Sequence, residues 1–224
     1  MKKNRKDPVF DLERAYADCH RIALRLADAE RPGRALDLGA GQGAISHALR
    51  LRGHDVMAAD INGSQFKAAG VPFARLDLNR PLPLPDGDFD LVMAVEVLEH
   101  LESPRAFLRE IYRLLRPGGL AVVTTPNITS LPSRMLFLAT GCFDLFVPTK
   151  RRLEDPLDAE ADGHITPLPG WLLRYHLRES GFEIEKTCYT MAYVPFVPRA
   201  VLRFFRGRFL GRVGLYAVRR PPLA

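Results

Sequence analysis

The sequence has few of the features that stabilise a protein without a hydrophobic core or place it in a membrane. Its 224 residues include only three cysteines, Cys19, Cys142 and Cys188, whose odd number and wide spacing fit neither a disulfide framework nor a zinc site. It contains no uninterrupted apolar run of about 18 residues, and its basic amino terminus lacks the apolar stretch of a secretory signal. These absences predict a reduced, cytoplasmic protein without membrane-spanning helices.

Acidic residues are missing from the last part of the chain. Eight of the 32 basic residues follow Glu185 and no acidic residue does, which leaves 24 basic against 26 acidic residues in the rest. The formal net charge of +6 therefore comes from this tail. A local contact with an anionic partner is favoured over a nucleic-acid-binding surface, since the body is nearly neutral and no aromatic and basic RNA-binding module occurs.

Short apolar runs alternate with amphipathic stretches through most of the sequence. Strand-like runs occupy residues 35–39, 55–60, 72–78, 89–95, 120–125, 182–190 and 212–220, and helical patterns occupy residues 10–30, 44–51, 104–115 and 169–182. Such alternation predicts a parallel α/β sheet. With 47% hydrophobic residues, the chain can form one packed domain.

A glycine-rich segment, LDLGAGQGA (36–44), lies between a predicted strand and a predicted helix. Gly39, Gly41 and Ala44 satisfy the loose dinucleotide fingerprint, and Asp60 lies at the distance expected of a ribose-binding acid. Asp37 argues against a dinucleotide, because a carboxylate beside the loop would repel a pyrophosphate and attract an ammonium group. The loop therefore predicts a cofactor that carries positive charge and no phosphate.

Five signals in order resemble the class I S-adenosylmethionine-dependent methyltransferases, particularly the small methyltransferase type 11 group. They are LDLGAGQG, the acid Asp60, LDL ending at residue 78, FDLVMAVEVLEHL, and LLRPGGLAVVTTPN, and the likeness covers about residues 30–190. The resemblance implies a Rossmann-like, doubly wound sheet of seven strands, six parallel and the last antiparallel, with helices on both faces. RVGLYAVRR would supply the last strand.

The resemblance also implies which residues bind S-adenosylmethionine. The residues it implicates are Gly39, Gly41 and Gly43 around the methionine part, Asp60 at the ribose, and Asp77 with Leu78 at the adenine. The predicted cofactor-binding set also includes Asp37, for its charge, and Ile61, which is adjacent to Asp60. Plainer interpretations remain open, because Asp at a strand end is commonly a cap or turn residue. Gly43 could likewise serve only helix packing.

The segment EVLEH (96–100) places Glu96, Glu99 and His100 directly after an apolar strand. Three roles remain open: a general base, for which His100 has the most suitable pKa; a divalent metal site; and capping of the next helix. EVLEH is similar to the metal-binding EMLEH of ubiquinone-pathway O-methyltransferases and EVIEH of small-RNA 2′-O-methyltransferases. His164, within GHITPLPGW, would complete such a metal set or only pack at a turn. The favoured hypothesis is catalysis by Glu96, Glu99, His100 and His164 without a metal.

Three segments flank the predicted sheet within a single methyltransferase domain, residues 1–224. Residues 1–34 are predicted to form an N-terminal helical cap, and 128–165 a lid-like insertion whose apolar first half suits a greasy acceptor or covers the sheet as extra helices. Residues 194–212 form a basic amphipathic segment, which covers the core or contacts an anionic membrane. Membrane contact would place the protein peripherally at the inner membrane.

The function predicted is O-methylation of a small or lipid-linked hydroxyl acceptor, such as a glycan or a quinone precursor. One alternative is a metal-dependent RNA 3′-terminal 2′-O-methyltransferase, which the near-neutral body of the protein disfavours. Another is a cofactor-binding scaffold without catalysis, which would tolerate the loss of Glu96, Glu99 and His100.

Overall fold

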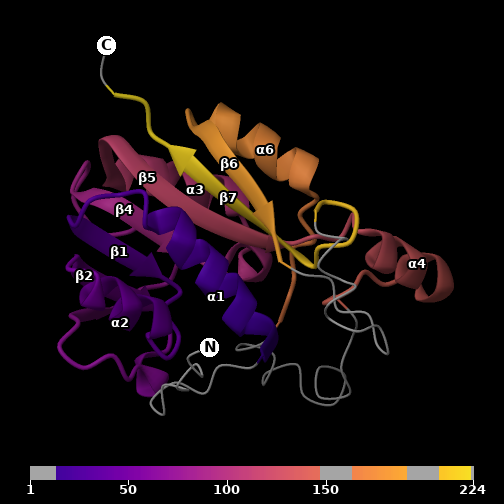
Figure 1. Ribbon diagram of the computed structural model, residues 1–224, viewed down its shortest axis with the longest axis horizontal. Coiled ribbons are helices and arrows are strands. Elements are labelled where there is room, and N and C mark those ends of the chain that lie inside the picture. Colours follow the sequence, from indigo (N-terminus) through magenta and orange to yellow (C-terminus); the bar gives the residue numbers. More distant parts are fainter. Residues whose placement is uncertain (1–13, 147–162, 191–206, 223–224) are drawn as a thin grey trace, which may run out of the picture.

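The computed structural model describes residues 14–146, 163–190 and 207–222 (Figure 1). Its strands are β1 (Arg34–Leu38), β2 (Asp55–Asp60), β3 (Phe73–Arg75), β4 (Phe89–Ala94), β5 (Leu115–Pro126), β6 (Glu183–Tyr189) and β7 (Val213–Arg219). Its helices are α1 (Arg14–Ala27), α2 (Ala44–Leu51), α3 (Pro104–Leu114), α4 (Leu131–Thr140) and α6 (Gly170–Glu179), with short 3-10 turns η1 (Gly63–Gln65) and η2 (Leu98–His100).

The seven strands form one sheet in the order β3-β2-β1-β4-β5-β7-β6. Pairing is parallel from β3 through β5, whereas β7 pairs antiparallel with both β5 and β6. Six strands therefore share one direction and the last strand opposes them, which confirms the predicted sheet. Strand order reverses between β1 and β4, and the carboxyl ends of these two strands flank the place where such sheets bind ligands.

Helices cover both faces of the sheet because its central strands are apolar on both sides. On β4, Leu91 and Met93 join the core under α1 and α2, while Val92 and Ala94 join the core under α3 and α6. This near-continuous burial is typical of parallel strands covered on two faces. Figure 1 shows α1 lying across the sheet, and it contacts β5 and β7 through a face that includes Cys19 and Ala23.

Two strands differ from their predicted extents. β3 ends at Arg75 rather than residue 78, because the Asp77 carboxylate accepts a hydrogen bond from Asn79 N (2.9 Å) and turns the chain. β5 begins at Leu115 rather than residue 120, so the RPGG part of the LLRPGGLAVVTTPN signal lies within the strand and not before it. Hydrogen bonds between Gly118 N and Arg220 O (2.8 Å) and between Arg220 N and Gly119 O (2.9 Å) extend the ladder there.

Three predicted segments are only partly described. Residues 1–13 of the predicted N-terminal cap lie outside the described residues, and α1 belongs to the described part. Residues 147–162 of the predicted lid also lie outside them. α4 lies within the predicted lid, at the side of the molecule away from α2 (Figure 1). Of the predicted basic segment 194–212, residues 194–206 lie outside the described residues, and 207–212 form the turn before β7. In the part of the chain that the structure describes, no helix is long and apolar enough to cross a membrane.

Candidate active site

Predicted site residues gather at the carboxyl edge of the sheet, together with Thr124, for which the sequence predicted no role. Gly39 follows β1, Asp60 ends β2, Glu96 lies two residues after β4, and Thr124 lies near the end of β5. The parallel strands bring these positions together although Gly39 and Thr124 are 85 positions apart in the sequence. A ligand at this edge can contact loops from several strands at once.

The glycine loop combines tight packing with one open position. Gly39 has φ +74°, and a Cβ there would lie 2.4 Å from Val97 Cγ2. Gly43 has φ +88°, precedes α2, and a Cβ on it would meet Phe66 and Ala68 at 2.7 Å. Gly41, with φ +51°, has no atom within 4 Å of the place a Cβ would take. Gly39 and Gly43 therefore serve the fold, and Gly41 leaves room for a ligand against the backbone.

This contrast predicts different stabilities for two alanine variants. Gly39→Ala and Gly41→Ala both place a side chain at positive φ, but only the first also drives a methyl group into Val97. We expect Gly39→Ala to lower the free energy of unfolding by about 1–3 kcal/mol more than Gly41→Ala, the usual cost of overpacking. Urea denaturation of both variants measures the difference, and equal losses would contradict the packing role of Gly39.

Asp37 is a buried carboxylate beneath the loop. Its side chain belongs to β1, is 2% exposed, and accepts a hydrogen bond from Ser46 Oγ of α2 (2.5 Å). Burial raises the pKa of Asp37 to about 6, an effect that the hydrogen bond from Ser46 opposes. Ionised at neutral pH, Asp37 gives this edge a negative charge suited to an ammonium group.

The other predicted cofactor residues occupy the adjoining loops. Asp60 accepts hydrogen bonds from Gly41 N (2.8 Å) and Asn62 N (3.0 Å), so it ties the end of β2 to the open glycine. Ile61 beside it is 56% exposed. Asp77 accepts from Asn79 N and from Arg80 Nε (3.0 Å), as a turn residue would, and Leu78 packs on the core below α3.

Glu96 is held in an unusual backbone conformation by two neighbouring elements. Its φ is +59°, which costs a residue with a side chain on the order of 1–3 kcal/mol. Glu96 N donates to Thr124 Oγ1 (2.7 Å), and Glu96 Oε1 accepts from that hydroxyl (3.3 Å) and from Cys19 Sγ of α1 (3.1 Å). Burial raises the pKa of Glu96, while the hydrogen bonds from Cys19 and Thr124 and the charge of Arg212 lower it.

Glu99, His100 and His164 form a compact cluster. One ligand-type atom from each lies within 4.8 Å of the others, and the two imidazole rings meet edge to face with centroids 4.7 Å apart. The backbone builds this contact, because Glu99 O accepts hydrogen bonds from Ile165 N (2.9 Å) and Thr166 N (3.0 Å). The structure thus brings His164 to His100, as the sequence predicted for this pair.

The chemistry of the cluster follows from its hydrogen bonds and burial. His100 Nδ1 lies 3.2 Å from Gly163 O, and since a carbonyl oxygen only accepts, a hydrogen bond there needs the proton on Nδ1. His100 Nε2 is then the basic nitrogen. Glu99 is fully buried, and neither carboxylate oxygen has a hydrogen-bond partner in another described residue. The pKa of Glu99 is raised well above its ordinary value, mainly by burial and to a smaller extent by the negative charge of Glu96.

Two residues at the site had no sequence prediction. Thr124 belongs to the TTPN segment, which served only as a family signal, and its position at the end of a strand could have indicated a role. Cys19 carried no signal, since a single cysteine in a predicted helix reads as a small apolar residue. Only the packing of α1 across the sheet brings its thiol to Glu96.

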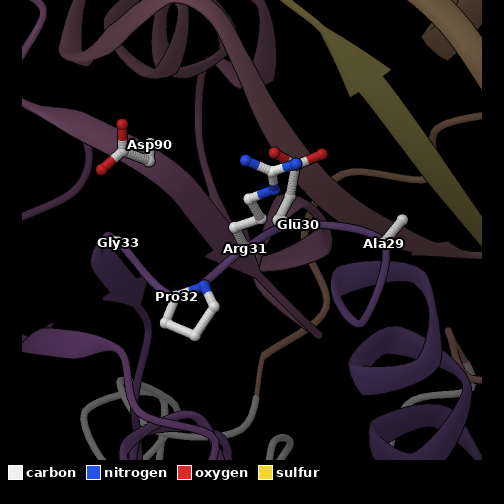
Figure 2. A pocket seen from close by; sticks show the side chains of 6 residues that line it. All are labelled: Ala29, Glu30, Arg31, Pro32, Gly33 and Asp90. Atoms are coloured by element: carbon white, nitrogen blue, oxygen red, sulfur yellow. The ribbon is translucent and has the colours of Figure 1, made fainter.

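A separate hollow lies at the opposite edge of the sheet. Ala29, Gly33 and Asp90 are among the residues that line it, where the chain enters β1 (Figure 2). The Asp90 carboxylate accepts hydrogen bonds from Arg34 N (2.8 Å) and from Arg116 Nη1 (2.9 Å). This hollow has none of the predicted site residues and lies at the amino ends of the strands.

The sheet order, the glycine loop, Asp37 near the end of β1 and Asp60 at the end of β2 define the class I S-adenosylmethionine-dependent methyltransferase fold. The chain belongs to the methyltransferase domain family, whose model matches residues 10–187. The open backbone at Gly41 beside Asp60, with the buried Asp37 charge, fits the cofactor of that class.

Individual known proteins resemble the chain over different lengths. A ubiquinone biosynthesis O-methyltransferase of Psychrobacter arcticus is 33% identical over 47% of this chain and 45% of its own length. A probable S-adenosylmethionine-dependent methyltransferase of Mycobacterium tuberculosis is 32% identical over 57% of this chain and 48% of its own length. The chain thus spans about half the length of these curated relatives. A possible histamine N-methyltransferase of Thermotoga maritima shares the fold, with TM-score 0.63 and 19% identity over 92% of this chain and 91% of that chain.

Proposed function

We propose that the protein transfers a methyl group from S-adenosylmethionine to a hydroxyl oxygen of a small or lipid-linked acceptor, and that a quinone precursor is the best-supported acceptor class. The observation that supports this proposal is the position of His100 in the turn after β4, where a hydrogen bond from Nδ1 to Gly163 O (3.2 Å) would leave Nε2 as the nitrogen that accepts the proton. The donor supplies an electrophilic methyl group on a sulfonium, so the protein's own task is to align the hydroxyl and remove its proton.

The acceptor class is supported by chemistry and by relatives. A phenolic hydroxyl has a pKa near 10, so a neutral imidazole beside it contributes directly to its loss of a proton. Several relatives are named as ubiquinone biosynthesis O-methyltransferases. For this chain, an aromatic diol is therefore the first acceptor to test.

Cofactor binding is the first test of this proposal. Calorimetry should show saturable binding of S-adenosylhomocysteine, and Asp60→Ala should weaken it by about 1–3 kcal/mol because a polar partner is left unpaired. Asp55→Ala, a change of an exposed acid at the start of β2, should leave binding unchanged. Saturable binding of NAD without binding of S-adenosylhomocysteine would refute the proposed donor.

A second candidate is a methyltransferase that depends on a divalent metal held by Glu99, His100 and His164. What favours it is the buried Glu99 carboxylate, which has no hydrogen-bond partner in another described residue, next to two imidazoles. Two ligands at 2.0–2.2 Å from one ion lie at most about 4.4 Å apart, so a cluster spread over 4.8 Å would have to contract slightly. The RNA alternative shares this requirement, although the charge distribution disfavours it.

Metal binding can be measured without knowledge of the acceptor. If the second candidate is right, titration with Mn²⁺ should show one site, and Glu99→Gln should weaken it at least about 10-fold because an amide is a poorer ligand than a carboxylate. Glu102→Gln, an exposed acid beyond the cluster, serves as the control. Absence of Mn²⁺ binding together with methyl transfer in a chelator would leave the metal-free proposal.

A further inference from the structure

We propose that the exposed face of α4 and the neighbouring turn at residues 207–212 form a surface that docks on an anionic lipid bilayer. This proposal concerns where the protein works and does not depend on which acceptor it methylates. Its starting point is an exposed apolar stripe on α4: Leu131 is 54% exposed, Met135 58% and Leu138 80%.

These side chains share one side of the helix. Positions 131, 135 and 138 follow the spacing of a single α-helical face, and Arg134 belongs to the same face. Only Ser133 of α4 is buried, where its hydroxyl accepts a hydrogen bond from Asp144 N (3.0 Å). An apolar helix that buries so little of itself is not explained by packing against the described core.

The turn before β7 adds to the same surface. Leu131 N donates to Phe209 O (2.6 Å), so the start of α4 is bonded directly to a residue whose side chain is 63% exposed. Asn127 Nδ2 donates to Arg208 O and Gly211 O, both at 2.8 Å, and clamps the turn in place. The proposed docking surface consists of Leu131, Arg134, Met135, Leu138, Arg208 and Phe209.

Charge identifies the partner as anionic. Residues 127–143 and 207–212 contain no acidic residue, and Asp144, which follows the first of these ranges, is held in an ion pair by Arg212 (2.9 Å). Arg134 and Arg208 are exposed, and the Arg208 guanidinium lies over the Phe209 ring at 4.8 Å. Apolar side chains bordered by arginines suit the boundary between acyl chains and anionic headgroups.

Size disfavours a second copy of the chain as the occupant. A helix of ten residues is about 15 Å long and 10 Å wide, so its exposed face is much smaller than the roughly 800 Å² per partner of a stable interface. Two-fold pairing through this face would also bring the arginines of the two copies together. A bilayer needs only shallow insertion of a few side chains and has no such area requirement.

Vesicle co-sedimentation of the full chain tests the proposal. Vesicles of phosphatidylcholine with about 30% phosphatidylglycerol should bind the protein, and pure phosphatidylcholine should bind it much less. Leu131→Ser/Met135→Ser/Leu138→Ser should reduce binding at least about 10-fold, since each exposed apolar side chain contributes by burial in the interface. Arg134→Gln should reduce binding to anionic vesicles about fivefold, the effect of roughly one basic residue at such a surface.

Matched controls lie elsewhere on the molecule. Leu51→Ser changes a residue that is 73% exposed at the end of α2, and Arg109→Gln changes an exposed arginine of α3. Both should bind vesicles as the unchanged protein does. Leu138→Trp in a Trp171→Phe background provides a single fluorophore on the surface, whose emission should shift to the blue with anionic vesicles.

Three results would overturn the proposal. The first is equal recovery in the supernatant with anionic and neutral vesicles, and the second is vesicle binding that the α4 variants leave intact. The third is a fall of more than about 5 °C in the melting temperature of the triple serine variant, because residues that face lipid contribute little to folding. Such a fall in melting temperature would show that the three side chains are buried against other parts of the protein, or against a second copy if the fall depends on protein concentration.

Discussion

Replacement of His100 by alanine is expected to lower kcat/KM for a hydroxyl acceptor by about 10²–10⁴-fold, the usual contribution of a general base. The imidazole is oriented by Gly163 O at 3.2 Å and stands edge to face against His164, so its basic nitrogen is held in one direction. S-adenosylhomocysteine affinity should stay within about twofold, because His100 is not among the residues predicted to bind the cofactor. Steady-state kinetics with an aromatic diol and calorimetry measure the two quantities.

His176→Ala is the matched control for this result. His176 is a half-buried histidine on α6, outside the cluster at the sheet edge, and its loss should leave kcat/KM within about threefold of the starting value. His164→Ala should have an intermediate effect if His164 only supports the His100 ring. Full activity of His100→Ala in a variant of unchanged melting temperature would exclude His100 as the base.

The second large effect concerns Asp37, where stability and binding should move in opposite directions. Burial raises the pKa of this carboxyl from 3.8 to about 6, so the folded protein holds an unfavourable charge at neutral pH. The difference of about two pKa units corresponds to about 3 kcal/mol. Asp37→Asn should therefore stabilise the ligand-free protein at pH 7 by up to this amount, since an amide oxygen can still accept from Ser46 Oγ.

The pH dependence of this effect has a defined sign. Because the folded pKa lies above the unfolded one, the cost is complete above pH 6 and is relieved as the pH falls toward 3.8. The advantage of Asp37→Asn in chemical denaturation should shrink over the same range, and Asp55→Asn, at an exposed position, should show no such trend. The same variant should bind S-adenosylhomocysteine about 10-fold or more weakly, as its ammonium loses an opposite charge. A variant that is less stable and binds normally would contradict this account.

The sheet could be predicted because its signals are local. Apolar runs such as 89–95 and the Gly39–Gly43 loop identify strands and their turns without knowledge of distant contacts. The antiparallel direction of β7 came from the family resemblance rather than from periodicity. The ends of β3 and β5 were misplaced because a side-chain turn at Asp77 and long-range pairing of Gly118 with Arg220 decide them.

The site was predictable only in part for a related reason. A family pattern indicated that His164 lies near His100. In the structure, hydrogen bonds from the backbone N–H groups of residues 165 and 166 to Glu99 O bring the two histidines together. The contact of Cys19 with Glu96 spans 77 positions and depends on how α1 crosses the sheet. The positive φ of Glu96 had no sequence signal, since a carboxylate at that angle is uncommon and is held by Thr124.

The hydrogen bond from the Cys19 thiol to Glu96 joins α1 to the carboxyl edge of the sheet, where the proposed catalytic residues lie. A fragment trimmed to begin at β1 would retain every strand and the whole glycine loop, and it would pass as a complete minimal fold. It would also uncover Leu91, Met93 and Val122, and it would deprive Glu96 of the Cys19 partner that favours its ionised form. A design that transfers this sheet into another protein would therefore have to include α1.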